Sequence, residues 1–276
     1  MEYRLLPVVA LLVGFIFTRW ACKPFLALLS GAGLVRPNYK AQEIPVGAGA
    51  VFFFALIITT IITFAAVPGY LNKDKILSFL FLAAITTLAG IMDDAFGSRQ
   101  VSGLKGHLGR LFKGELTTGA LKALAISSGS LIIFLPAEAP WEALFNAALV
   151  ALFVNSINLF DLRPGRAGKV FLIAAFAIII VSWKEHELLP LWVMVGALLA
   201  FLPVDLRARA MMGDAGANTL GASLGIAVAW TMDIGVRVAV FLGLLILHLL
   251  AERYSFTKII ARNRVLNFLD LLGRRE

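Results

Sequence analysis

The strongest constraint in this sequence is a series of long apolar runs, several close to 20 residues, separated by short polar segments. A helix needs about 20 mostly apolar residues to cross the hydrocarbon core of a bilayer. Of the 276 residues, 60% are hydrophobic and only 15% charged, and the mean hydropathy is +0.88. Soluble domains carry about a quarter charged residues. The runs therefore predict an all-α, polytopic integral membrane protein.

We expect about nine transmembrane helices and no separate soluble domain or internal repeat. The first run resembles a secretion signal, but Arg19 and Trp20 stand where cleavage needs small residues, so we interpret it as an uncleaved span. The single cysteine, Cys22, excludes an internal disulfide. The predicted spans lie near residues 3–20, 44–67, 76–92, 117–135, 142–160, 170–183, 189–203, 217–232 and 235–251.

The distribution of positive charge predicts the orientation. With the N-terminus outside, the inward-facing segments hold 19 Lys and Arg residues and the outward-facing segments hold five. Inward loops of membrane proteins are enriched in Lys and Arg. We therefore expect an outside N-terminus and a cytoplasmic C-terminus, and we assign the net charge of +8 to this rule and to anionic membrane lipid, not to nucleic acid. The inward-facing segments are 18–43, 93–116, 161–169, 204–216 and 252–276.

The last segment, 252–276, differs from the transmembrane domain 1–251. It mixes Lys258 and Arg262 with Phe256 and Ile259, and its other residues continue this mixture. Such a pattern is typical of an amphipathic helix that lies on a membrane surface. We expect a basic, cytoplasmic amphipathic tail on the inner leaflet, with a surface for a partner helix as the alternative.

Acidic residues gather at the predicted inner ends of the spans. Asp93 and Asp94 end the third span, and Asp214 opens the eighth within a Gly-Asp-Ala-Gly turn. Backbone N–H groups at a helix N-terminus favour anions. Adjacent side chains on a helix point about 100° apart, so Asp93 and Asp94 can face different partners.

Other polar residues fall on the same side of the membrane. Asn155, Asn158 and Asp161 are spaced i, i+3, i+6, which places them on one face of a helix. Lys122 lies about a turn and a half inside the fourth span, and the segment before the second span carries Arg36 and Lys40. Each group alone is compatible with a solvated interface residue, and Lys122 with a side chain that reaches the headgroups. Their concentration on one leaflet predicts a shared site, because acids near hydrocarbon usually mark function.

The chemistry of these residues suits phosphate and a hard cation. Carboxylates with few histidines favour Mg²⁺, which takes oxygen ligands and bridges carboxylates to substrate phosphates. Arg and Lys suit phosphate oxygens. The residues alone therefore predict metal-assisted phosphate chemistry at the inner leaflet. A cation transporter is the alternative, although its acids would lie nearer to the bilayer midplane.

An ordered set of motifs over residues 36–225 resembles the polyprenyl-phosphate N-acetylhexosamine-1-phosphate transferases. This superfamily includes phospho-MurNAc-pentapeptide translocase and the bacterial enzymes that transfer GlcNAc-1-phosphate to undecaprenyl phosphate. The matching features are Arg36, Ile44-Pro45, Gly47 and Gly49, Asp93-Asp94, Lys122, the stripe Asn155/Asn158/Asp161, and Met212-Gly213-Asp214-Ala215-Gly216.

The resemblance implies a multi-span helical enzyme of the bacterial inner membrane with a cytoplasmic active-site cleft, and a homodimer. It implies Mg²⁺-dependent transfer of a sugar-1-phosphate from a UDP-sugar to a polyprenyl phosphate, with release of UMP, in cell wall biogenesis.

The resemblance also implies roles for individual residues. Either acid of the pair Asp93-Asp94 would orient or deprotonate the lipid phosphate, and Mg²⁺ would neutralise the diphosphate. The catalytic residues are then Asp93, Asp94 and Asp161; the metal ligands are Asp214 and Asp94; and the substrate-binding residues are Arg36, Lys40, Lys122, Asn155, Asn158, Arg163, Arg166 and Lys169.

Two features depart from the family pattern. Where the family continues its stripe to a second acid three residues after Asp161, this chain has Pro164 followed by basic residues, which could hold phosphate instead. The family's late His-rich loop and tenth span are also missing. The three histidines are His107, His186 and His248, and we interpret His248 as a packing residue. A relative that binds lipid phosphate or nucleotide sugar without turnover is therefore a further alternative.

Overall fold

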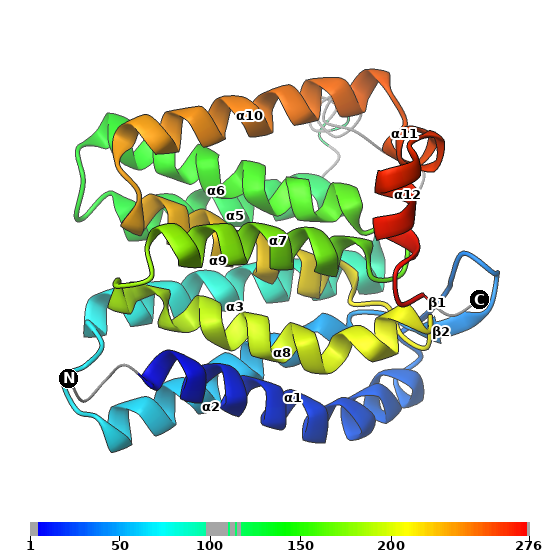
Figure 1. Cartoon of the computed structure of the whole chain (residues 1–276), viewed down its shortest axis with the longest axis horizontal. Helices are drawn as coiled ribbons and strands as arrows, with labels where there is room; N and C mark the ends of the chain where they lie inside the picture. The colour runs from blue at the N-terminus through cyan, green and yellow to red at the C-terminus, as the bar shows by residue number, and fades with distance from the viewer. Residues whose placement is uncertain (1–4, 98–109, 111–113, 115–116, 275–276) are drawn as a thin grey trace.

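The computed structural model describes residues 5–97, 110, 114 and 117–274, and its described part is almost entirely helical (Figure 1). The all-α prediction is confirmed. Long helices of the described part lie where the nine spans were predicted. They are α1 (Leu6–Gly31), α2 (Val51–Ala66), α3 (Lys73–Phe96), α5 (Thr118–Phe134), α6 (Pro140–Phe160), α7 (Arg166–Val181), α8 (Leu189–Leu206), α9 (Gly213–Thr231) and α10 (Ile234–Arg253).

The remaining elements are short. A two-stranded antiparallel hairpin, β1 (Val35–Pro37) and β2 (Glu43–Pro45), pairs Arg36 with Ile44 and was not predicted. Single 3₁₀ turns, η1 (Ala48–Ala50) and η2 (His186–Leu188), precede α2 and α8. The tail forms two helices, α11 (Phe256–Arg262) and α12 (Arg264–Leu271).

The tail helices are separated at Asn263. The Asn263 side chain accepts hydrogen bonds from the backbone N–H groups of Val265 (3.0 Å) and Leu266 (3.1 Å). An asparagine that caps a helix in this way has a non-helical backbone, so it starts α12 and breaks continuity with α11. The contact of this tail with a membrane surface stays a prediction.

Among the described residues, six helical segments are long and apolar enough to cross a membrane, so the chain is a helical membrane protein. The predicted count of nine spans is supported only in part. Helix α5 is apolar but shorter, α7 has only 16 residues, and α9 is long enough with 19 residues but is not among the apolar segments. The six segments are Leu6–Gly31, Ala48–Ala66, Lys73–Phe96, Pro140–Phe160, His186–Leu206 and Ile234–Arg253.

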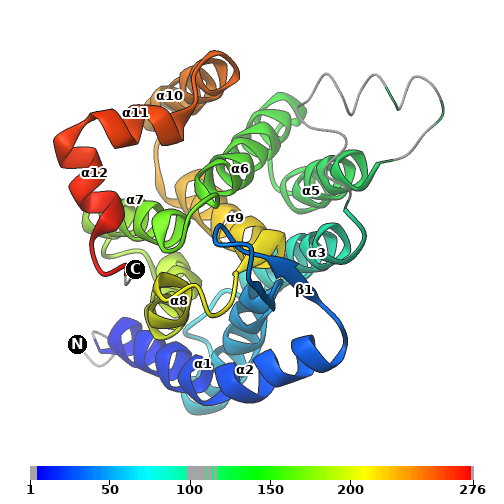
Figure 2. The same cartoon turned by 90° about the vertical axis from the view of Figure 1, so that its right-hand side faces the viewer.

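Helix α9 lies in the centre of the bundle, surrounded by α2, α3, α6, α7 and α8 (Figure 2). Nearly all of its residues are buried, although many are Gly, Ala, Ser, Thr or Asn. Small residues let helix backbones approach closely. At Gly49 and Gly216, for example, a Cβ added to either residue would overlap the backbone of the other. Because protein and not lipid surrounds α9, it does not need an apolar surface.

The two ends of the bundle differ. The hairpin and the helices α11 and α12 lie at one end, and the start of α1 lies at the other (Figure 1). The described parts of the segments that the charge distribution placed inside lie at the first of these ends. The orientation of this end toward the cytoplasm stays a prediction.

Candidate active site

A cleft of about 1760 Å³ opens at the end of the bundle that carries the hairpin. Its polar part is built from the C-terminal ends of α3 and α6, the N-terminal ends of α5 and α9, and the hairpin. Most of the predicted site residues, which are distant in sequence, therefore line one cavity. They are Arg36, Asp93, Asp94, Lys122, Asn155, Asn158, Asp161, Arg163 and Asp214.

The carboxylate of Asp94 holds the first turn of α9. Its Oδ1 accepts the backbone N–H of Asp214 (3.0 Å), and its Oδ2 accepts that of Ala215 (3.1 Å). Helix N-terminal N–H groups lack partners within their helix, and an anion stabilises them. Gly213 precedes this turn with a positive φ of 68°, and a Cβ there would overlap the Asp94 carboxylate. The Gly-Asp turn is therefore fitted around Asp94.

Lys122 lies between two other carboxylates. Its Nζ is 2.5 Å from Asp214 Oδ2 and 3.8 Å from Asp93 Oδ2. Asp93 and Asp214 also lie within hydrogen-bonding reach of each other. All three side chains are partly exposed to the cleft, at 19 to 28%. One cation thus faces two carboxylates, with Asp94 immediately behind them.

The hairpin segment fixes the loop before α9. The Met211 N–H donates to the Pro45 carbonyl (2.8 Å), and the Gly49 N–H donates to the Met212 carbonyl (2.9 Å). Arg36 donates from Nη2 to the carbonyl oxygens of Asp94 (3.3 Å) and Ala95 (3.2 Å). A cation at a helix C-terminus satisfies the last carbonyls and the helix dipole. These contacts tie the ends of α3 and α9 to the hairpin.

Two residues of α9 hold the neighbouring helices. Asn218 is fully buried, accepts from Asn158 Nδ2 (2.6 Å), and donates to the Thr86 carbonyl (3.4 Å). The hydroxyls of Thr87 and Thr219 are 2.7 Å apart. The sequence reasoning missed Asn218. Its position one turn after Asp214, on the same helical face, was the available signal.

Asp161 lies at the end of α6 in an acidic environment. Burial raises its pKa well above the ordinary value of 3.8, and the negative charges of Asp205, Asp214 and Asp94 raise it further. Asp205, at the end of α8, also lines the cleft and was missed. Asp205 lies in the inward-facing segment 204–216, on the same side of the membrane as the four predicted acids, and this position was the available signal. Asp205 is 4% exposed as a residue, and its carboxylate accepts the Gly165 N–H (2.9 Å).

Three predicted substrate-binding residues lie apart from the cleft lining. Lys40 is exposed, with its Nζ 5.5 Å from the centre of the Tyr39 ring. Arg166 and Lys169 point to the C-terminal tail, where both contact Asp270. The sequence predicted that Arg166 and Lys169 bind phosphate, because it could not show that Asp270 binds them instead.

The histidines are dispersed. His248 is half-buried in α10, lines the cleft, and places its Nδ1 2.7 Å from the Leu244 carbonyl oxygen. His186 stacks edge-on against Tyr70. His107 lies outside the described residues. Pro164, which stands where the family pattern has a second acid, also lines the cleft.

The carboxylates of the cleft wall are oxygen ligands of the kind that Mg²⁺ takes. Within the described ranges, no group of three or more His, Cys, Asp or Glu side chains forms a ready-made metal centre. Mg²⁺ commonly takes only one or two carboxylates and completes its shell with water and substrate phosphate oxygens. The pair of Asp93 and Asp214 offers oxygen ligands of this kind at the cleft wall.

Comparison with known proteins gives one family. A family model described as "Glycosyl transferase family 4" matches residues 76–232, which is more than half of the chain. The matched region runs from α3 to the end of α9 and so contains most of the residues that line the polar part of the cleft. No curated protein matches the chain.

Proposed function

The chain belongs to glycosyl transferase family 4, the family of phospho-MurNAc-pentapeptide translocase and the polyprenyl-phosphate hexosamine-1-phosphate transferases, and from this membership we propose its reaction. The family supports transfer of a sugar phosphate to a lipid carrier. We propose that this chain transfers an N-acetylhexosamine-1-phosphate from a UDP-sugar to a polyprenyl phosphate, with release of UMP, at the cytoplasmic face of a bacterial inner membrane.

The observation that carries the proposal is the convergence of Asp93, Asp94, Asp214 and Lys122 on one cleft wall. Phosphoryl transfer needs little covalent chemistry from the protein and depends on positioning and charge stabilisation. Three carboxylates around one ammonium leave an excess of negative charge. Such a wall suits a divalent cation and the phosphates that the cation bridges.

The proposed reaction forms one P–O bond and breaks another. An oxygen of the polyprenyl phosphate attacks the phosphorus atom that carries the sugar. The bond from that phosphorus to the bridging oxygen breaks, and UMP leaves with the bridging oxygen. The product is a polyprenyl diphosphate sugar.

We propose that Asp93 and Asp214 hold Mg²⁺, which when bound neutralises charge on the diphosphate. Asp94 already accepts two N–H groups of α9, so we propose that it orients Asp214 and does not act as the principal ligand. Lys122 would pair with a phosphate oxygen in place of its present contact with Asp214. This division refines the predicted roles of the acid pair.

The other polar lining residues would position the donor. Asn158 donates to Asn218, and among the described residues nothing hydrogen-bonds its buried Oδ1, which is left to accept from a substrate N–H or O–H. Asn155 and Asp161 lie beside it on the same helix. The guanidinium of Arg163 lies 5.2 Å from the centre of the Tyr39 ring and borders the cleft, where it can meet phosphate.

The apolar part of the cleft suits a lipid acceptor. The cavity continues between α5, α6 and α10, where its lining is mostly aliphatic or aromatic; the residues include Ala123, Ile126, Ala151, Phe241, Leu245 and Leu249. A polyprenyl chain could lie there with its phosphate at the acidic wall. A homodimer stays a prediction.

The test is UMP release by the purified protein with undecaprenyl phosphate, Mg²⁺ and a panel of UDP-N-acetylhexosamines. Asp214→Asn and a chelator should each abolish release, whereas Asp74→Asn, an exposed acid in the first turn of α3, should not. Release that requires lipid, metal and Asp214 would support the transferase and identify the donor. Absence of release from folded protein that binds lipid phosphate would favour the non-catalytic relative.

A further inference from the structure

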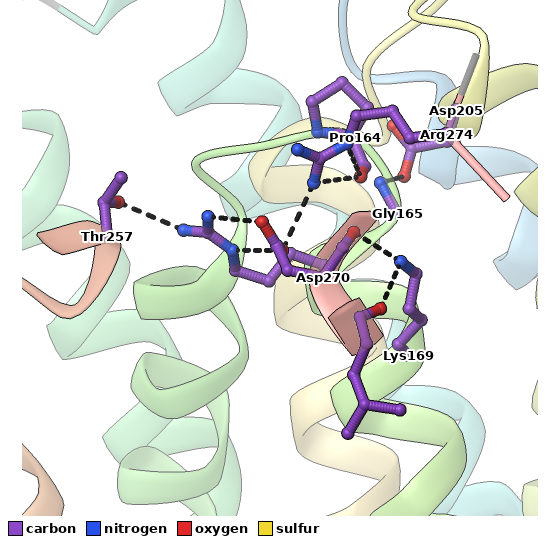
Figure 3. A network of polar contacts seen from close by, with 9 residues as sticks. Pro164, Gly165, Lys169, Asp205, Thr257, Asp270 and Arg274 are labelled. Carbon is purple, nitrogen blue, oxygen red and sulfur yellow. Dashed lines mark hydrogen bonds and ion pairs between the residues drawn. The ribbon is translucent and has the colours of Figure 1, made fainter. Parts of the chain in front are cut away.

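The C-terminal tail is attached to the bundle through a buried ion pair. Arg166 donates from Nε to Asp270 Oδ1 (2.7 Å) and from Nη2 to Asp270 Oδ2 (3.0 Å). The two side chains are each 6% exposed, although they lie 104 residues apart in sequence. A second contact joins Arg166 Nη1 to the hydroxyl of Thr257 in α11 (3.1 Å; Figure 3). Both tail helices therefore meet the start of α7.

The same network reaches the loop between α6 and α7. Arg274 bonds Asp270 (3.2 Å) and donates from Nε (3.3 Å) and Nη2 (3.0 Å) to the carbonyl oxygen of Pro164 (Figure 3). Lys169 donates to the carbonyls of Leu269 (2.8 Å) and Asp270 (2.6 Å), which closes the end of α12. The Asp270 carboxylate thus meets two guanidinium groups, and its backbone carbonyl meets the ammonium of Lys169.

Asp205 holds the other side of this turn. Gly165, which follows Pro164, has a positive φ of 74° and donates its N–H to the Asp205 carboxylate. Two consecutive residues of the loop are therefore held from opposite sides. The N–H of Gly165 is bound by Asp205 of α8, and the carbonyl of Pro164 is bound by Arg274 of the tail. Leu162, Arg163 and Pro164 of the same loop line the cleft.

The tail does not dock mainly by apolar burial. In α12, Val265 and Phe268 are 67% and 65% exposed, and other large apolar residues of this helix are also exposed. The buried contacts of α12 are instead the directional, charge-assisted hydrogen bonds of Asp270 and, after it, Arg274. Such bonds fix position more narrowly than apolar contact does.

We propose that α12 is a strap that positions the loop 161–165 at the cleft, with Asp270 and Arg274 as its positioning residues. The strap does not touch the reacting atoms but acts through the Pro164 carbonyl. This inference rests on the proposed function for the identity of the ligand that the loop meets, which is the nucleotide-sugar donor beside Asp161 and Arg163.

The experiment compares Arg274→Ala, just after the end of α12, with Arg264→Ala, a substitution of an exposed arginine at the start of α12. Arg274→Ala leaves the Arg166–Asp270 pair in place, so the protein should fold. Hydrogen–deuterium exchange in detergent should show at least about tenfold faster exchange for peptides over residues 161–167 in Arg274→Ala, because a hydrogen bond to a charged group is lost. Arg264→Ala should match the wild type.

Kinetics give the second readout. Arg274→Ala should raise the KM for the donor about tenfold and leave the KM for the lipid acceptor within about twofold, because only the donor side of the cleft loses its support. Arg274→Lys keeps the charge but not the two-pronged contact, and should restore part of the loss.

Four outcomes separate the possibilities. Unchanged loop exchange in Arg274→Ala would overturn the strap, and so would faster exchange across all helices, which would make Arg274 a residue of general stability. Equal effects on both KM values would also contradict it. If the wild type releases no UMP with any donor, the proposed function fails, yet the exchange experiment still decides whether the tail fixes the loop.

Discussion

Two clusters of charged side chains lie at the same end of the bundle, the cleft wall around Asp214 and the tail network around Asp270. In the cleft, the carboxylates of Asp93 and Asp214 share Lys122 and border open space. In the tail network, one carboxylate meets two guanidinium groups and all three side chains are nearly excluded from solvent. A buried charge that is fully paired holds structure together, whereas an excess of one charge beside a cavity is prepared for a ligand of the opposite sign.

The titration of two acids shows the same difference. Burial and the neighbouring carboxylates raise the pKa of Asp161. Burial would also raise the pKa of Asp270, but the hydrogen bonds and charge of Arg166, with Arg274 and Lys169, outweigh it and lower the pKa. The charged form of an aspartate is thus disfavoured at Asp161 in the cleft and favoured at Asp270 in the tail.

The largest effect should come from Asp214→Asn. We expect transferase activity to fall about 10³- to 10⁴-fold, since a ligand to the metal and the diphosphate is lost. The thermal midpoint should stay the same or rise, because one of several crowded acids is removed. UMP release at saturating substrates and thermal unfolding in detergent measure both. A fall in activity that parallels a fall in the midpoint would place Asp214 with the structural cluster.

Asp270→Asn should instead reduce stability, whereas Asp214→Asn reduces activity. Breaking a buried ion pair by removing one partner should lower the free energy of unfolding by about 3 to 5 kcal/mol. The double variant Arg166→Met with Asp270→Leu should lose less, because Arg166 is no longer left buried without its partner and Arg274 keeps its hydrogen bonds to the Pro164 carbonyl. Denaturant unfolding in detergent micelles measures the difference. A loss below about 1 kcal/mol for Asp270→Asn would show that the pair is solvated like a surface bridge.

Lys122→Met should reduce activity about 10- to 100-fold, which is smaller than the effect of Asp214→Asn because a bound metal would neutralise part of the same charge. Lys122→Arg should be intermediate, since the charge is kept with a different shape. Steady-state rates of UMP release at several Mg²⁺ concentrations provide the test. If Lys122→Met gains activity, the ammonium competes with the metal and does not assist it.

Stability should depend on pH in opposite directions at the two clusters. The folded pKa of Asp270 is lowered, so its contribution is present above the unfolded pKa of about 3.9 and is lost as pH falls through the folded pKa. The folded pKa of Asp161 is raised, so its contribution is present below the unfolded pKa and is lost as pH rises through the folded pKa.

Unfolding midpoints measured from pH 3 to 8 should therefore show Asp270→Asn converging with the wild type at the acid end. Asp161→Asn should instead gain on the wild type toward neutral pH, because the buried site disfavours the charged carboxylate and so raises the pKa of Asp161. Parallel pH profiles for the wild type and both variants would contradict the contrast.

The smallest effect should come from Lys40→Ala. Its exposed ammonium lies outside the cleft lining, so we expect activity to change less than about threefold. Arg163→Ala, in which a residue at the cleft is lost, should reduce activity more. The two variants are compared by kcat/KM for the donor. A larger loss for Lys40→Ala would restore its predicted role in substrate binding.

Much of the fold could be predicted because lipid-facing helices carry apolar residues over a fixed length. Helix α10 has this composition and almost no buried surface, so hydropathy identifies it readily. Helix α9 contributes Asp214 and Asn218 and is buried, so its small and polar residues reflect contact with other helices. Hydropathy identifies helices that face lipid, and α9 faces other helices instead.

The site was predictable for the polar residues that lie at the ends of the predicted spans. Asp93, Lys122, Asp161 and Asp214 gather as predicted because alternating spans return their ends to one face. Arg166 could not be distinguished from a phosphate-binding residue, because its partner Asp270 is distant in sequence and lies in a tail that the charge pattern assigned to the membrane surface.

The two hydrogen bonds from α9 to Asp94 make Asp94 and Asp214 one mechanical unit. Substitution of Asp94 removes the support of the turn that aims Asp214, so its kinetic cost includes misalignment as well as any lost chemistry. Groups that act as a unit are strongly non-additive in mutant cycles. A double variant of Asp94 and Asp214 should therefore be scarcely slower than either single variant, and rates of Asp94 variants alone do not identify a catalytic base.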